Sequence, residues 1–328
     1  MLERRKFIKK CLNKFIPLVI SNVISEYDYH LIGKCELTLS DHFSSVKCCA
    51  ALSDKVVSGA CDNTLKIWNT QTGECELTLI GHTGFITCCS ILPNDKIVSG
   101  SADTTLKIWN AKTGKCELTM LGHSNWVICC ATISNEKIVS GSRDGTFKIW
   151  NTKTGECELT TITEYTIECC AIISDCSSPK IFSGYYNGSI KIWNTQNGKC
   201  ELTMQDNTIT CCCIMFDGKI VSGSIDGTLK IWNAKTGECE LILKDKSSAW
   251  TCCNILPDGR IISGSSDATL SIWNIQTELF ELSDSIISNS KSELTIKSHS
   301  AKWLNCICVL PDGRLVSGSD DGTLKIWS

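Results

Sequence analysis

The sequence has few of the features that mark membrane, secreted or cofactor-dependent proteins. Among its 328 residues, no apolar run approaches the ~20 residues that span a bilayer. The apolar stretch 15–24 follows basic residues, but Pro17, Ser21 and Asn22 interrupt it and no small-residue cleavage site follows, so we expect no signal peptide. No glycine-rich phosphate loop or metal-spaced ligand set is present, so we expect no cofactor.

Positive charge is scarce outside the first residues. The formal net charge is −3, and the first 14 residues carry six basic side chains against one acidic one. The rest therefore has 26 basic and 34 acidic residues, a net charge of −8. Phosphate backbones are bound by clustered lysine and arginine, so we expect no nucleic-acid partner for this acidic body. With 42% hydrophobic and 20% charged residues, its composition is that of a globular protein.

A repeat of about 40 residues dominates the chain and predicts its architecture. The dipeptide Ile-Trp occurs seven times, at spacings of 39 to 54 residues, and such a period is typical of solenoids and propellers. In the second unit, turn residues separate four segments rich in β-formers: 86–90, 96–100, 105–109 and 115–120. Four antiparallel strands per unit predict a propeller blade.

The two ends of the repeat region complement each other. The sequence stops at Ser328, directly after a third strand, whereas 34–39 (KCELTL) is a fourth strand with no third strand before it. We predict that these segments pair. The chain would then be an all-β ring of seven four-stranded blades over residues 31–328, preceded by an extension, residues 1–30.

Several fixed positions of the repeat resemble the WD40 family of β-propellers. In the second unit these are Gly81-His82, the Ser-Gly-Ser of 99–101, Asp103 and the Lys-Ile-Trp-Asn of 107–110. The Trp-Asp dipeptide of the family is Trp-Asn in six units and Trp-Ser in the last, and asparagine keeps a side-chain acceptor that can start the next turn. The resemblance implies a buried hydrogen-bond network of His, Ser, Asp and Trp within a blade. Carried over, the complete sets are His42, Ser58, Asp62, Trp68; His82, Ser99, Asp103, Trp109; His123, Ser140, Asp144, Trp150; and His299, Ser317, Asp321, Trp327.

The middle blades depart from this pattern. Thr163, Gln205 and Lys246 stand where the histidine is expected, and Asn187 replaces the aspartate of blade four. We therefore expect blades four to six to be locally looser, because they lack the complete network. Histidine, serine and aspartate also form catalytic triads, but an enzyme needs one site and this set occurs four times at one place in a repeat. We interpret the network as structural and the chain as non-catalytic.

The 24 cysteines follow the repeat as well. Most form adjacent pairs in the first strand of a blade or single positions in the fourth strand, and no Cys-x-x-Cys spacing occurs. Adjacent strand residues point to opposite faces, so the members of a pair should neither share a metal nor form a disulfide. We expect free thiols that act as small buried hydrophobes. That state suits a reducing compartment, the cytoplasm or nucleus.

Two positions of the repeat vary in residue type from blade to blade, so we expect that the fold does not require a particular side chain there. One lies three residues before the first cysteine of each pair, and the other directly before the turn aspartate. Their largest side chains have the composition of an interface hot spot, and we predict that they bind a partner protein: Phe85, Trp126, Arg143, Tyr186 and Trp303. The alternative is that these rings pack under neighbouring loops.

The N-terminal extension has apolar residues three and four apart, which predicts an amphipathic helix broken near Pro17. It could pack on the propeller, dock a partner or lie on a membrane surface. The stretch 16–27 faintly resembles the start of an F-box, so the alternative function is a ubiquitin-ligase substrate receptor that docks its adaptor through residues 1–30. A third possibility is an enzyme with its site in the central channel.

Blade six carries about 12 extra residues. Both 279–282 and 293–296 can be aligned to its fourth strand, and the polar, serine-rich stretch 283–292 is expected to be an exposed loop.

Overall fold

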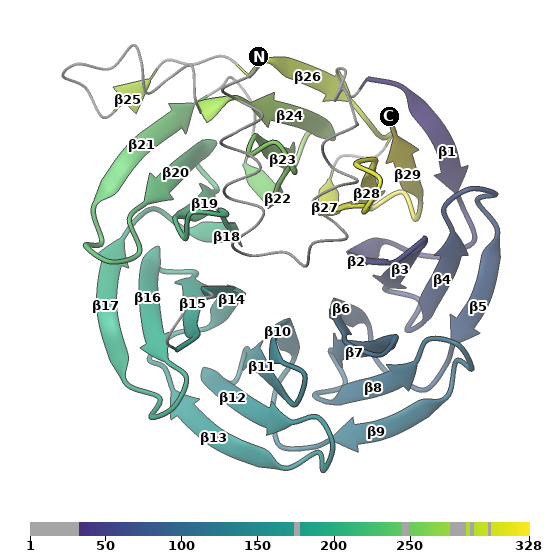
Figure 1. Cartoon of the computed structure of the whole chain (residues 1–328), viewed down its shortest axis with the longest axis horizontal. Helices are drawn as coiled ribbons and strands as arrows, with labels where there is room; N and C mark the ends of the chain where they lie inside the picture. Colours follow the sequence, from purple (N-terminus) through teal and green to yellow (C-terminus); the bar gives the residue numbers. More distant parts are fainter. Residues whose placement is uncertain (1–32, 174–177, 245–248, 276–286, 289–291, 301–302) are drawn as a thin grey trace.

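The described part of the chain is a ring of β-sheets around a central axis (Figure 1). This computed structural model describes residues 33–173, 178–244, 249–275, 287–288, 292–300 and 303–328. Seven sheets follow one another around the ring, each with its first strand next to the axis and its fourth strand outside. The predicted all-β, seven-bladed propeller is confirmed. The predicted helices within residues 1–30 lie outside the described residues.

The strands of the blades follow in chain order. Blades one to three are β2 (Val46–Leu52), β3 (Lys55–Ala60), β4 (Leu65–Asn69), β5 (Cys75–Leu79); β6 (Ile86–Leu92), β7 (Lys96–Ser101), β8 (Leu106–Asn110), β9 (Cys116–Met120); and β10 (Val127–Ser134), β11 (Lys137–Ser142), β12 (Thr146–Asn151), β13 (Cys157–Ile162). Blades four and five are β14 (Ile167–Ile173), β15 (Lys180–Tyr185), β16 (Ser189–Asn194), β17 (Cys200–Gln205); and β18 (Ile209–Ile214), β19 (Ile220–Ser224), β20 (Thr228–Trp232), β21 (Cys239–Lys244). Blades six and seven are β22 (Trp250–Ile255), β23 (Ile261–Ser265), β24 (Thr269–Trp273), β26 (Leu294–Lys297); and β27 (Leu304–Val309), β28 (Leu315–Ser319), β29 (Leu324–Trp327), β1 (Cys35–Leu39).

The last blade is built from both ends of the repeat region, as predicted. Strand β1 pairs antiparallel with β29, so that Leu39 lies opposite Leu324 and Cys35 opposite Trp327. The backbone N–H of Gly33 extends this pairing with a hydrogen bond to the carbonyl of Ser328 at 3.0 Å. Leu39 is fully buried in a cluster that also contains Val46 of blade one. The pairing thus completes blade seven and joins it to blade one.

The hydrophobic core lies between consecutive blades. One cluster, for example, joins Val57 and Ile67 of blade one to Ile86 and Trp109 of blade two. The blades approach so closely that a Cβ atom at Gly59 of blade one would lie 2.9 Å from the Cβ atom of Ile86 in blade two. Only glycine fits there without displacement.

The asparagine of Trp-Asn starts the turn into the fourth strand. The side-chain oxygen of Asn69 accepts hydrogen bonds from the backbone N–H groups of Gln71 and Thr72, at 2.9 and 3.1 Å. Its amide nitrogen donates to Glu76 of the fourth strand at 3.0 Å, which an aspartate could not do. Trp-Asn and the glutamate of Cys-Glu-Leu-Thr therefore act together, and the expected turn role is confirmed.

Blade six takes the second of its two candidate fourth strands. Strand β26 pairs with β24, placing Leu294 opposite Ile272, whereas 279–282 lies outside the described residues. A two-residue strand, β25 (Ile287–Ser288), pairs in parallel with β21 of blade five. The insertion therefore adds a fifth strand to the neighbouring sheet.

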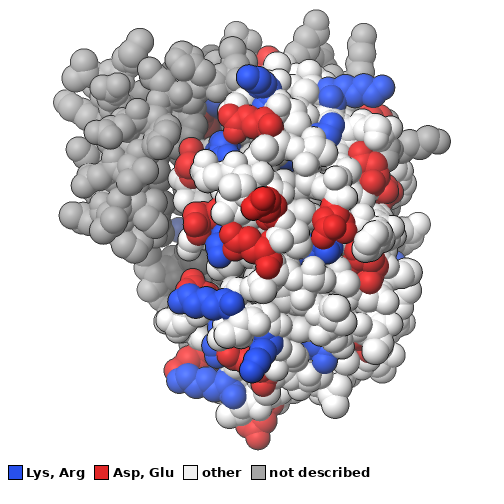
Figure 2. Space-filling model, turned by 90° about the vertical axis from the view of Figure 1, so that its right-hand side faces the viewer, with Lys and Arg blue, Asp and Glu red and all other residues white. Residues whose placement is uncertain are grey.

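Acidic and basic side chains are mixed over the outer wall that Figure 2 shows. Ion pairs link second-strand lysines to fourth-strand glutamates, as between Lys55 and Glu76 at 2.7 Å and between Lys96 and Glu117 at 2.9 Å. Exposed pairs of this kind contribute little to stability. Within the described residues, no helix has the length and apolar composition needed to cross a membrane.

The pairing of β1 with β29 predicts the result of removing it. A variant without residues 33–39 in addition to 1–32 should melt at least about 6 °C below a variant that lacks 1–32 alone, because burial of Leu39 contributes about 2–3 kcal/mol. It should also form oligomers, since β29 becomes an edge strand. Calorimetry and size-exclusion chromatography measure both effects. Equal melting temperatures would contradict the role of this strand in closure.

Candidate functional site

Four blades contain an aligned chain of hydrogen bonds from an indole to a carboxylate. In blade one, Trp68 Nε1–H donates to Ser58 Oγ at 2.8 Å, and Ser58 lies 2.7 Å from His42 Nε2. His42 Nδ1 lies 2.7 Å from Asp62. Because an indole can only donate and a carboxylate can only accept, the chain is satisfied by a neutral imidazole protonated on Nδ1.

The other three sets repeat this geometry. The distances from histidine Nδ1 to the aspartate are 2.8 Å in blades two and three and 3.2 Å in blade seven. In every set the serine directly precedes the glycine of the second strand, in Ser-Gly-Ala in blade one and in Ser-Gly-Ser in the other three, and its side chain is fully buried: Ser58, Ser99, Ser140 and Ser317. A buried hydroxyl cannot contact a substrate. These four chains therefore stabilise the blades.

Burial favours the neutral form of His82, His123 and His299, and hydrogen bonds keep their aspartates charged. Burial opposes ionisation of Asp103, but hydrogen bonds from Thr105, from the backbone N–H of Thr83 and from His82 outweigh it and lower the pKa of Asp103 to about 2. Burial lowers the pKa of His82 below its usual value despite the adjacent carboxylate. The same two directions hold for Asp144 and His123.

Blades four and five replace the histidine with other side chains. In blade four the buried hydroxyl of Tyr185 lies 3.0 Å from Ser183 Oγ, which also accepts the indole N–H of Trp193. Asn187 caps its turn as an aspartate would, accepting from the backbone N–H of Ser189 at 3.0 Å. Thr163, at the expected histidine position, is buried with its hydroxyl 2.9 Å from the carbonyl of Gly145.

The prediction that Gln205 occupies the histidine place of blade five is wrong by one residue. Asp206 is the side chain that accepts from Ser222, at 3.1 Å, and it also pairs with Lys230. The amide of Gln205 instead donates to the carbonyl of Asn187. The shift follows from charge, because a buried carboxylate that pairs with lysine can take the place of the imidazole. Lys246 lies outside the described residues.

The two variable positions lie side by side on one face of the ring. This upper face carries the loops from each fourth strand into the next first strand and the turns between second and third strands. Backbone hydrogen bonds join the two positions in six blades: Cys61 to Ser45, Ala102 to Phe85, Arg143 to Trp126, Ile225 to Thr208, Ser266 to Ala249 and Asp320 to Trp303.

Three of the predicted partner-binding residues form one cluster across blades two and three. The rings of Phe85 and Trp126 meet edge to face with centroids 6.4 Å apart, and the guanidinium of Arg143 lies 4.5 Å from the centroid of the Trp126 ring. Trp126 therefore contacts both Phe85 and Arg143, and 36% of its surface remains exposed. This Phe85–Trp126–Arg143 cluster is held in place before any partner binds.

The other two predicted residues lie apart from this cluster. Tyr186 is 65% exposed on blade four and Trp303 is 51% exposed on blade seven. Next to Trp303 in the ring, Asp320 accepts hydrogen bonds from Lys47 and Asn305, each at 2.8 Å. The five residues thus occupy separate places around one face.

Several further residues of this face were not predicted from the sequence as candidates for partner binding. Glu168 lies in the first strand of blade four, where burial raises its pKa and the charge of Arg143 opposes that rise. Further exposed apolar side chains also lie here, at strand ends or in loops: Phe43, Ile80, Leu121, Ile162, Tyr165 and Ile225. Ile80, Leu121 and Ile162 recur 41 residues apart, so a search of the repeat for apolar loop positions could have found them.

The family model for the WD domain, G-beta repeat, matches seven segments that cover most of the chain: 33–69, 73–110, 114–151, 156–194, 198–233, 237–274 and 290–328. The chain belongs to the WD40 family. Members of this family generally mediate protein–protein interactions. A comparison with curated proteins found no significant match.

The cysteines of this WD40 ring differ from their prediction in how far some of them are exposed. All described cysteines are free thiols, but Cys116, Cys157 and Cys200 are exposed, because the fourth strand faces solvent. The members of an adjacent pair do point to different sides, yet each has a cysteine of the neighbouring blade within reach, as Cys48 packs against Cys89. The expectation that the thiols are buried is therefore wrong for Cys116, Cys157 and Cys200.

Breaking one of the hydrogen-bond chains should destabilise the WD40 ring. His123→Ala leaves Asp144 and Ser140 buried without their partner, and we expect a loss of about 3 kcal/mol in the free energy of unfolding. The double variant His123→Ala/Asp144→Ala should lose less than the sum of the two single changes. Denaturant titration of all four proteins measures this coupling, and strict additivity would show that the chain has no cooperative role.

Stability should fall on acidification in two steps. The folded pKa values of His82 and Asp103 both lie below the ordinary values of these groups, 6.5 and 3.8, so the unfolded state binds more protons in both ranges. The free energy of unfolding should decline below about pH 6.5, and again from about pH 4 towards pH 2. Denaturant titration at several pH values tests this, with His82→Gln as the variant that weakens the first step. Constant or rising stability from pH 7 to 5 would contradict it.

Proposed function

We propose that this WD40 propeller is a non-catalytic interaction scaffold that binds partner proteins through its upper face. The observation that supports this proposal is the unequal distribution of exposed apolar side chains between the two faces of the ring. Of the eleven large apolar side chains that the described residues expose, ten lie on the upper face and one, Phe216, lies in a loop of the opposite face. Exposed apolar surface that is concentrated on one face is typical of binding surfaces.

The Phe85–Trp126–Arg143 cluster is the proposed anchor of the interface. Aromatic residues and arginine dominate interface hot spots because they bury large areas at a small cost in side-chain entropy. Among the described residues, no carboxylate lies within ion-pair distance of Arg143. A partner segment with an apolar side chain for the two rings and a carboxylate for Arg143 would fit this cluster.

The upper face can be tested by matched alanine variants. Trp126→Ala and Trp303→Ala should each reduce partner capture at least tenfold, since hot-spot residues contribute about 2 kcal/mol or more. Phe216→Ala is the control, because its side chain is similarly exposed at 44% on the opposite face. Quantitative affinity capture with mass spectrometry measures these changes, and calorimetry should give melting temperatures within about 4 °C of the unchanged protein.

Equal loss of capture in Phe216→Ala, or full capture by Trp126→Ala, would contradict the proposed interface. A large fall in melting temperature for Trp126→Ala would favour the alternative, in which these rings pack under neighbouring loops.

Partner capture also distinguishes this proposal from a role as a ubiquitin-ligase receptor. A ubiquitin-ligase receptor that docks its adaptor through residues 1–30 would lose the adaptor, but not other partners, when those residues are deleted. An enzyme with its site in the channel would need carboxylates or imidazoles that converge on the cavity. The residues that line the described cavity are mostly cysteine and threonine, which supports the proposed role in binding partner proteins over catalysis. The free thiols support our proposal of a reducing compartment, the cytoplasm or nucleus.

A further inference from the structure

The first-strand cysteines form pairs across the junctions between blades. The first cysteine of one blade packs against the second cysteine of the next blade, whose strand lies beside it around the channel. Six junctions carry such a pair: Cys48 with Cys89, Cys88 with Cys130, Cys129 with Cys170, Cys169 with Cys212, Cys211 with Cys253 and Cys306 with Cys49. We call these six the inter-blade thiol pairs. At two of these junctions a third thiol adjoins the pair, Cys213 beside Cys253 and Cys308 beside Cys49.

The seventh junction shows that the pairing follows from the ring geometry. Between blades six and seven, Cys252 packs against Ile307, which stands where the second cysteine would be. One position in the ring therefore offers a lone thiol in the same surroundings as the pairs.

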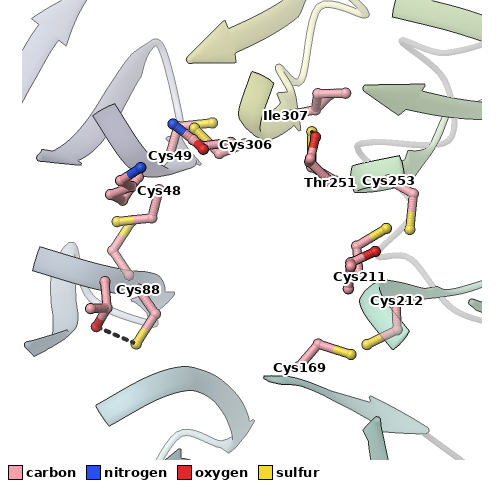
Figure 3. Close-up of a pocket in the computed structure, with 16 residues that line it drawn as sticks. Cys48, Cys49, Cys88, Cys169, Cys211, Cys212, Thr251, Cys253, Cys306 and Ile307 are labelled. Carbon is pink, nitrogen blue, oxygen red and sulfur yellow. Dashed lines mark hydrogen bonds between the residues drawn. The ribbon is translucent and has the colours of Figure 1, made fainter. Parts of the chain in front are cut away.

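The thiol pairs surround a cavity in the channel. It has a volume of about 220 Å³ and is lined by cysteines of blades one, two, four, five, six and seven. Figure 3 shows the sulfur atoms of Cys169 and Cys212, and those of Cys211 and Cys253, directed toward each other. Four of the second cysteines, Cys49, Cys89, Cys212 and Cys253, line this cavity and are only partly buried, so small solutes can reach them from the channel.

We propose that the channel binds soft monovalent metal ions of the Cu(I) type, with one ion held linearly between the two sulfur atoms of an inter-blade thiol pair. Soft thiolate ligands select Cu(I) among the biological metals, and this ion accepts two-coordinate binding. Zinc prefers four ligands in a tetrahedron. Within the described residues, no group of three or more His, Cys, Asp or Glu side chains is placed to hold a metal. Pairs of thiols thus favour Cu(I) over Zn(II).

The binding step leaves all oxidation states unchanged. Two S–H bonds break, two Cu–S bonds form, and two protons pass to the solvent, which leaves a bis-thiolate complex with one net negative charge. Metal coordination deprotonates a thiol that would otherwise stay neutral.

Disulfide formation is the less favourable chemistry for these pairs. Burial raises the pKa of the Cys48 and Cys129 thiols, the first cysteines of their pairs, well above the usual value. The thiolate is the species that peroxides and disulfides react with, so little of the reactive form is present at neutral pH.

Adjacent cysteines of blade six provide a matched test. Cys252 and Cys253 are neighbours in β22, and both line the cavity, but only Cys253 belongs to a pair. Anaerobic titration of the reduced full chain with Cu(I), in competition with the chelator bathocuproine disulfonate, gives the number of tightly bound ions. The background carries Ser in place of the exposed Cys116, Cys157 and Cys200, of Cys11 and Cys176, and of Cys213, whose thiol also contacts Cys253. We expect Cys253→Ala to bind one ion fewer than this background and Cys252→Ala to bind the same number.

A gain-of-function variant protects the test against simple loss of folding. Ile307→Cys would supply the missing partner of Cys252 and should add one Cu(I) ion, and X-ray absorption should find two sulfur ligands per copper. Zn(II) should not be retained under the same competition. Equal effects of Cys252→Ala and Cys253→Ala, no gain in Ile307→Cys, or no Cu(I) retained in the background would overturn the proposal. The melting temperature of each metal-free variant verifies that it is folded.

Discussion

Closure of the ring by β1 and β29 is the constraint on which the other features depend. Each blade buries its hydrophobic surface only against its neighbours, so seven blades without closure would leave two apolar faces exposed. Once β1 completes blade seven, Leu39 and Val46 join the two ends in one cluster. The closed ring also fixes the position of every first strand around the channel. Both proposed sites follow from that placement, because each is made by residues of consecutive blades.

Much of the fold could be predicted because it repeats. The Ile-Trp period, the turn residues and the unpaired segment 34–39 together predicted seven blades and their closure, and each blade offers the same signals again. The sequence could not determine which candidate strand completes blade six, because 279–282 and 293–296 have similar patterns. It also misassigned Gln205, because the decisive feature is the ion pair of the buried Asp206 with Lys230, which depends on contacts outside the local pattern.

The candidate sites were only partly predictable for a related reason. Comparison of the repeats identified Phe85, Trp126 and Arg143 as residues that the fold does not require. It did not predict that they touch, since that contact joins loops of two blades. The cysteines illustrate the same limit. Within one strand Cys48 and Cys49 point apart, and only the ring brings Cys48 to Cys89 and Cys49 to Cys306.

The central functional claim is that the upper face is where partners bind. Hydrogen–deuterium exchange of the chain with and without a captured partner tests it most directly, because it measures protection of the loops on both faces in one experiment. We expect slower exchange in the upper-face segments 83–87, 124–128 and 142–145, with no change in the opposite loop around Phe216. Protection confined to the opposite face or to the outer strands would contradict it.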